Sequence, residues 1–155
     1  MYLPARDRFF KDKEVTRVSL SDTVPVYPYF NESLPEDIDW DDDKKRPLHQ
    51  MKKIMDSIKE EGLRRPLIGF RLPENMDKFN GDHRQRYDKL HFIHRNSPKW
   101  LELLKRPLHV VCGCQRWYVL HKLEVEETDM MIYNIQTEAA ILRQAELACR
   151  KEVWK

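Results

Sequence analysis

The chain has 155 residues, of which 35% are charged and 41% are hydrophobic. This length suits one hydrophobic core and is short for two, so we expect a single domain over residues 1–155. No apolar run approaches the roughly 18 residues of a membrane-spanning helix, and 28 basic against 26 acidic residues do not by themselves indicate nucleic-acid binding. With three cysteines and no apolar leader, we expect free thiols and a cytoplasmic protein.

The first part of the chain predicts a loose basic start, an edge strand, an acidic loop and a helix. Valines with flanking prolines in "EVTRVSLSDTVPVYPYF", residues 14–30, indicate the strand and an extended segment after it. The stretch to about residue 45 is acidic and lacks periodicity, which is typical of a solvated loop. From Pro47 the apolar spacing becomes helical, and Gly62 is the expected C-cap. The apolar positions are Leu48, Met51, Ile54, Met55 and Ile58.

The second half predicts strands alternating with helices around an insertion. Strands are expected over 63–70, 107–113 and 128–135, and helices over 114–124 and 137–153. Residues 73–107 are polar, rich in histidine and arginine, and interpreted as a helical insertion. The fold class is therefore α/β, with a small mixed sheet flanked by helices.

The segment "CGCQRW", residues 112–117, runs from a strand through glycine into a helix. The amides that follow Gly113 would lie in the first helical turn, where the helix dipole favours an anion and Arg116 can supply a bidentate fork. The same field would activate Cys114 as a nucleophile. The alternative is a junction that binds nothing, with Cys114 as a small buried residue. Strand alternation directs Cys112 into the core.

The order of helix, strand, "GCQRWYVLHKL" and strand resembles the ParB/sulfiredoxin superfamily, over residues 14–72 and 107–145. Its nucleotide-binding turn reads Gly-Glu-Arg-Arg in ParB proteins and Gly-Gly-Cys-His-Arg in sulfiredoxins. The resemblance implies a ParB/sulfiredoxin-like fold in which Gly113, Cys114, Gln115 and Arg116 bind nucleotide phosphates. In the first helix, the family's ATP-contacting positions fall on Gln50, Lys53 and Ser57, with Gln50 replacing the lysine.

This resemblance implies a nucleotide-phosphate-binding protein that takes ATP or CTP with Mg²⁺, and phosphoryl transfer or nucleotide hydrolysis as the activity, with Cys114 and Arg116 as the candidate catalytic residues. A second reading is a sulfiredoxin-like sulfinic acid reductase that uses Cys114 as its nucleophile. Members of the superfamily also include free-serine kinases and phage-encoded ParB-like proteins, so the fold does not choose between these chemistries.

The insertion supports a rival class of function. Its basic residues alternate with aromatic ones, a pattern that can follow a nucleic-acid backbone and stack on bases. The chain would then be a non-catalytic binding module that contacts nucleic acid or a protein partner through Arg84, Arg86 and Arg95. "NGDHRQRY", residues 80–87, is a competing glycine turn preceded by a poor strand. The insertion's histidines lack a recognised zinc spacing, so we expect no metal site.

Overall fold

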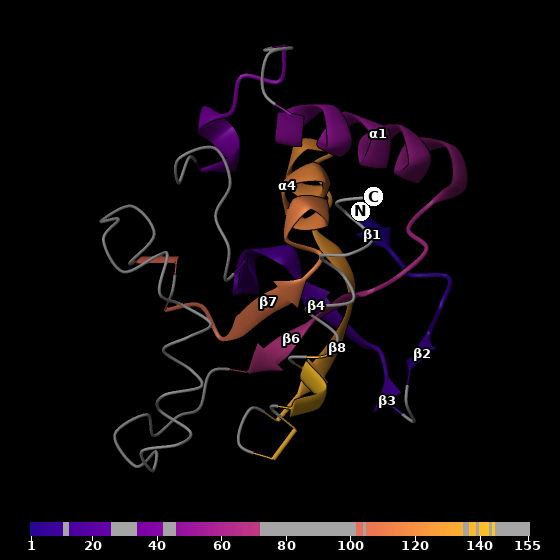
Figure 1. Cartoon of the computed structure of the whole chain (residues 1–155), viewed down its shortest axis with the longest axis vertical. Coiled ribbons are helices and arrows are strands. Elements are labelled where there is room, and N and C mark those ends of the chain that lie inside the picture. The colour runs from indigo at the N-terminus through magenta and orange to yellow at the C-terminus, as the bar shows by residue number, and fades with distance from the viewer. Residues whose placement is uncertain are drawn as a thin grey trace.

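The computed structural model describes residues 1–10, 13–25, 34–41, 46–71, 102–103, 105–134, 137–138, 140–142 and 144. Its main element is a mixed sheet, with two helices on one side (Figure 1). The fold is therefore of the mixed α/β class that the sequence predicts. The strands of this sheet are β1 (Tyr2–Leu3), β4 (Thr16–Ser19), β5 (Thr23–Pro25), β6 (Leu67–Arg71), β7 (Leu108–Cys112) and β8 (Glu127–Tyr133).

The longest strand, β8, organises the sheet. It pairs in parallel with β1 and β6 and antiparallel with β4. On the far side of β6 lies β7, antiparallel to it, and β5 closes that edge in parallel with β7. A separate small ribbon joins β2 (Phe9–Phe10) and β3 (Lys13–Glu14). Both parallel and antiparallel pairs thus meet within one small sheet.

Side chains of the central strands alternate between two apolar clusters. Leu67, Val110 and Met130 belong to the larger cluster, which also contains the buried faces of the helices α1 (Arg46–Glu61) and α4 (Cys114–Lys122). Phe70, Val111, Met131 and Tyr133 belong to the smaller cluster, with Val15 and Leu142. In Figure 1, α4 lies between α1 and the strands. The sheet is therefore covered on both faces, which explains why β7 is buried along its whole length.

The two helices agree closely with the sequence pattern. Leu48, Met51 and Ile58 are buried on one face of α1, and the amide of Gly62 donates to the carbonyl of Ile58 at 2.9 Å. Gly62 has φ +82°, the left-handed conformation that ends many helices. α4 ends at Lys122, two residues before the expected end, and β6, β7 and β8 fall within or beside the three expected strands.

The N-terminal region differs from the expectation in two ways. The start is not loose, since β1 pairs with β8 and the amide of Arg6 donates to the carbonyl of Leu63. The strand expected within residues 14–30 is interrupted by a 3-10 turn, η1 (Leu20–Asp22), and β4 and β5 join different partner strands. The hydroxyl of Thr23 donates to the carbonyl of Leu20 and fixes this break.

Other expectations lie partly or wholly outside the described residues. Within the expected acidic loop, Pro35–Asp37 forms a 3-10 turn, η2. Of the expected C-terminal helix, residues 140–142 and 144 are helical, and most of the insertion is not described.

Candidate functional site

The expected turn is present between β7 and α4. Gly113 has φ +97° and ψ 24°, a left-handed conformation, and no side chain caps the N-terminus of α4. A Cβ at Gly113 would lie 2.8 Å from Nη2 of Arg116 and 2.9 Å from Leu67. The left-handed backbone conformation therefore favours glycine, and a Cβ would also crowd the ends of the two neighbouring side chains. The first helical bond runs from the amide of Trp117 to the carbonyl of Gly113, at 2.8 Å.

The most unusual group at this turn is the amide of Gln115. The residue is 2% exposed, and its Oε1 is buried without a hydrogen-bond partner among the described residues. Its Nε2 lies 3.5 Å from Oε1 of Gln50 on α1, a long contact. Rotating both amides by half a turn would keep this pair and offer a buried N–H in place of the oxygen. A buried polar atom without a partner is costly, so a ligand is one explanation for it.

Arg116 is half-buried, and its guanidinium turns towards the loop between α1 and β6. Nη1 donates to the carbonyls of Arg65 and Pro66, the latter at 3.0 Å, and Nη2 lies 3.9 Å from Sγ of Cys112. These contacts hold the positive charge close to the first turn of α4. They also give Arg116 a structural role, since it joins the loop to the helix.

The two cysteines of the segment are both buried, but they differ in the state of their sulfur atoms. Cys114 is free but only 5% exposed, and its Sγ donates to the carbonyl of Val110 at 3.4 Å. This burial agrees with the alternative reading of Cys114 as a small buried residue, because the first turn of α4 directs its side chain into the larger apolar cluster. Cys112 is buried as expected, but it is disulfide-bonded and so does not carry the free thiol that we predicted.

The expected contributors from α1 lie along its accessible side. Gln50 reaches Gln115, whereas Lys53 and Ser57 are exposed. Ser57 follows Gln50 by seven residues, nearly two turns, and therefore lies on the same face of the helix. The structure thus joins α1 to the turn directly through Gln50 and places Ser57 further along that face.

The remaining expected site residues cannot be located. Arg84, Arg86 and Arg95 lie outside the described residues, as do the histidines of the insertion and the competing turn over 80–87. Within the described ranges, no three histidine, cysteine or acidic side chains are grouped so that they could hold a metal ion.

A buried polar cluster at the other end of α4 was not expected from the sequence. The indole N–H of Trp117 donates to Oγ1 of Thr23 at 2.8 Å. The ring of His121 packs edge-on against that of Trp117, with 4.3 Å between the ring centroids. Arg106 donates to the carbonyl of Thr23 at 2.9 Å. Burial, with Arg106 nearby, lowers the pKa of His121 to about 4. The cluster therefore holds a neutral histidine.

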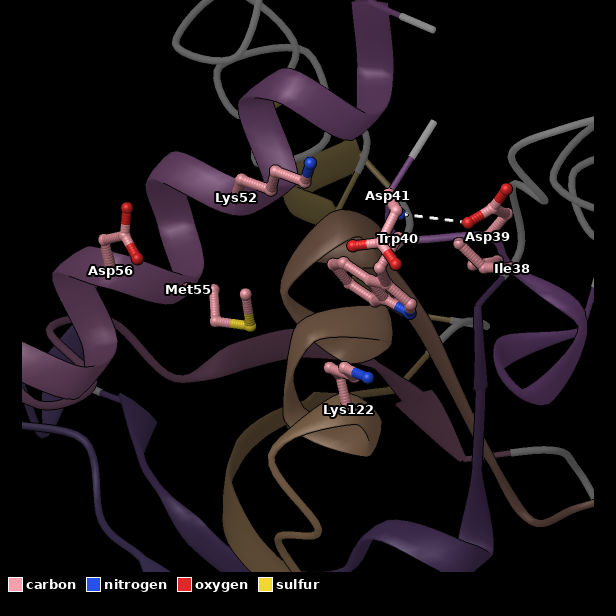
Figure 2. Close-up of a pocket in the computed structure, with 8 residues that line it drawn as sticks. All are labelled: Ile38, Asp39, Trp40, Asp41, Lys52, Met55, Asp56 and Lys122. Atoms are coloured by element: carbon pink, nitrogen blue, oxygen red, sulfur yellow. Dashed lines mark hydrogen bonds between the residues drawn. The ribbon is translucent and has the colours of Figure 1, made fainter. Parts of the chain in front are cut away.

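The described residues also form a pocket that the sequence reasoning missed. It lies between α1, α4 and residues 38–41, and has a volume of about 460 Å³ (Figure 2). Lys52, Met55 and Asp56 line it, on the side of α1 opposite to Gln50 and Ser57. The pocket is therefore distinct from the turn. A tryptophan within the acidic run "EDIDWDDD" was the available signal for it.

No protein-family model matches this chain, and no curated protein matches it significantly. None of the helices in the described part of the chain is both long and apolar enough to cross a membrane.

Proposed function

We propose that this protein is a ParB/sulfiredoxin-like nucleotide-phosphate-binding protein, and that its anion site is the first turn of α4. The observation that carries the proposal is the buried, unpartnered amide oxygen of Gln115 beside a helix N-terminus without a side-chain cap. Such a terminus attracts phosphate through its backbone amides and the helix dipole. The adjustable amide pair of Gln115 and Gln50 gives the site a polar wall.

The charge of Arg116 supports the same assignment. Its guanidinium, hydrogen-bonded to the loop carbonyls, keeps a fixed positive charge next to the turn. In phosphoryl transfer or nucleotide hydrolysis, such a charge stabilises the transferring group. The ligand of the proposal is ATP or CTP, and its Mg²⁺ would arrive on the phosphates, since the described residues provide no cluster of metal ligands.

A sulfinic acid reductase is the less favoured chemistry. It needs the sulfur of Cys114 to reach a substrate, whereas this thiol is buried and donates to the carbonyl of Val110. Binding through the backbone amides and Arg116 needs no exposed thiol. The cytoplasmic location remains a prediction, and the disulfide at Cys112 is unusual for that compartment.

Calorimetric titration of the full chain with ATP, CTP, GTP and ADP in the presence of Mg²⁺ tests the proposal. Wild type and Cys114→Ser should bind at least one of these nucleotides saturably, whereas Arg116→Ala should bind about tenfold more weakly or not at all. Arg64→Ala is the matched control, because Arg64 lies in the same loop, is exposed and pairs with Asp7 at 3.7 Å. Absence of binding by the wild type, or equal losses in Arg64→Ala and Arg116→Ala, would overturn the proposal.

A further inference from the structure

The pocket between α1, α4 and residues 38–41 presents an aromatic ring among charged groups. Trp40 packs partly against the larger apolar cluster, and Met55 adds an apolar wall from α1. Figure 2 shows the indole at the centre of the pocket, with Lys52 and Asp41 above it and Lys122 below it. The amide of Asp41 donates to Oδ1 of Asp39 at 3.0 Å, which holds the carboxylate of Asp39 against the backbone of this segment.

Acidic groups outnumber basic ones in this pocket. Asp39, Asp41 and Asp56 line it against Lys52 and Lys122. The adjacent turn η2 adds Glu36 and Asp37, which are both exposed. Among the described residues, the pocket and the adjacent turn therefore carry a negative balance, although the whole chain has a formal charge of +2. This contrast favours a positively charged ligand over a nucleotide or another anion.

A cation already lies over the aromatic ring. Nζ of Lys122 is 5.9 Å from the centroid of Trp40, near the outer limit of a cation–π contact. The face of the indole is thus directed towards a positive charge of the chain itself. A cationic ligand would therefore share the ring with Lys122 or displace its ammonium group.

We infer that the pocket binds the guanidinium group of an arginine side chain or of a related small molecule. A guanidinium stacks flat on an indole and forms paired hydrogen bonds to a carboxylate. In Figure 2 the carboxylate of Asp41 lies beside the indole of Trp40, whereas that of Asp39 is directed away from it. An ammonium group matches this geometry less well, since it is a compact point charge. Lys122 competes with the ligand for the ring. The site is separate from the turn of α4 and does not depend on nucleotide binding.

The test is an NMR titration of the full-length protein with Nα-acetyl-arginine methylamide, followed at the indole N–H of Trp40. We expect a saturable shift that the neutral citrulline analogue does not produce and that the lysine analogue produces only at higher concentration. Trp40→Leu keeps an apolar side chain against the core and should abolish binding, which is followed in this variant at the backbone amide of Asp41 because the indole probe is absent. Lys122→Gln, at an exposed position, should tighten binding about two- to fivefold by removing the competing cation.

The most decisive result is whether Lys122→Gln binds the arginine analogue more tightly or more weakly than the wild type. Weaker binding in Lys122→Gln would show that the pocket favours anions and would overturn the inference, as would the absence of a saturable shift in the wild type. An equal response to the citrulline analogue would also overturn it. Arg116→Ala should bind the arginine analogue as the wild type does, so the result is independent of the nucleotide proposal.

Discussion

Gln115 provides a prediction in which stability and binding change in opposite directions. Replacing it by methionine keeps its length and removes a buried acceptor that has no partner among the described residues. We expect Gln115→Met to raise the free energy of unfolding by about 1 kcal/mol, because an unsatisfied buried polar group costs about that much or more. Nucleotide affinity should fall in the same variant, as expected where a residue is kept for binding at the expense of stability.

Urea unfolding at pH 7.5 and the calorimetric titration measure these two effects. Gln50→Met is the control for the shared contact, because Gln50 is only half-buried and its loss leaves Gln115 in place. If Gln115→Met instead lowered the free energy of unfolding by more than about 1 kcal/mol, Gln115 would be a structural residue. The proposed site would then lose its main support.

His121 provides a prediction about pH. Its pKa in the folded protein is about 4, below the ordinary 6.5, because the ring is buried and Arg106 lies near it. The unfolded chain therefore binds the proton first as the pH falls, and stability is lost between about pH 6.5 and 4. His121→Phe keeps a ring against Trp117 and removes this titration. The free energy of unfolding of His121→Phe, relative to that of the wild type, should therefore rise by about 2 kcal/mol as the pH falls from 7 to 4.5.

The gain of His121→Phe should appear in urea unfolding curves recorded at several pH values. His49→Gln, at an exposed position on α1, serves as the control for the loss of a histidine. A constant difference between wild type and His121→Phe from pH 7 to 4.5 would contradict a buried neutral histidine. Other groups with a lowered pKa, such as Glu127 and Glu138, also make stability depend on pH. Their contribution is the same in wild type and variant, so it cancels in the comparison.

At the scale of elements, the pairing of β6 with β7 depends on a glycine. The register shifts between Ile68 and Gly69, and a Cβ at Gly69 would lie 1.8 Å from the carbonyl oxygen of His109. Because that neighbour is backbone, the two strands would have to separate. We expect Gly69→Ala to cost about 3 kcal/mol or to prevent folding, as measured by urea unfolding.

Gly62 is the matched control for Gly69. It also has a special position, with φ +82°, but a Cβ there would meet no atom within 4 Å. Gly62→Ala should therefore cost only about 1 kcal/mol, the penalty of the left-handed conformation itself. Equal losses in the two alanine variants would mean that the close approach of β6 and β7 relaxes easily.

The elements that the sequence predicts well are those with a local signal. The spacing of Leu48, Met51 and Ile58 defines α1, and the apolar run of β7 defines a buried strand. Strand pairing is not local, so the two-residue strand β1 has no pattern of its own and is stabilised by β8, more than a hundred residues away. The interruption of the expected strand at η1 depends on a hydrogen bond of Thr23, which periodicity does not indicate.

The candidate site likewise has features that the local sequence predicts and features that depend on tertiary packing. Glycine before a helix predicts the turn at Gly113, because the residue type limits the backbone there. The burial of Gln115 could not be predicted, since it depends on how α1 and β6 pack around α4. Neither could the direction of Arg116, whose guanidinium binds carbonyls of a loop about fifty residues earlier in the sequence.

At the scale of the whole molecule, Asp129 joins the start of the chain to its central strand. The carboxylate is 0% exposed and accepts hydrogen bonds from the hydroxyl of Tyr2, the amide of Ala5 and the guanidinium of Arg8. Asp129→Ala would leave the buried amide of Ala5 without this acceptor. We expect a loss of about 2 kcal/mol in the free energy of unfolding, because an unpaired buried donor carries that cost.

Glu127→Ala is the control on the same strand, since its pair with Arg17 is solvent-exposed and such pairs contribute little. Amide hydrogen exchange separates two consequences of Asp129→Ala. If residues 1–8 fold as one unit with the sheet, their protection and that of β8 should fall together, with a single unfolding transition. Loss of protection confined to residues 1–8 would show that the N-terminal segment opens independently of the sheet, contrary to one cooperative domain.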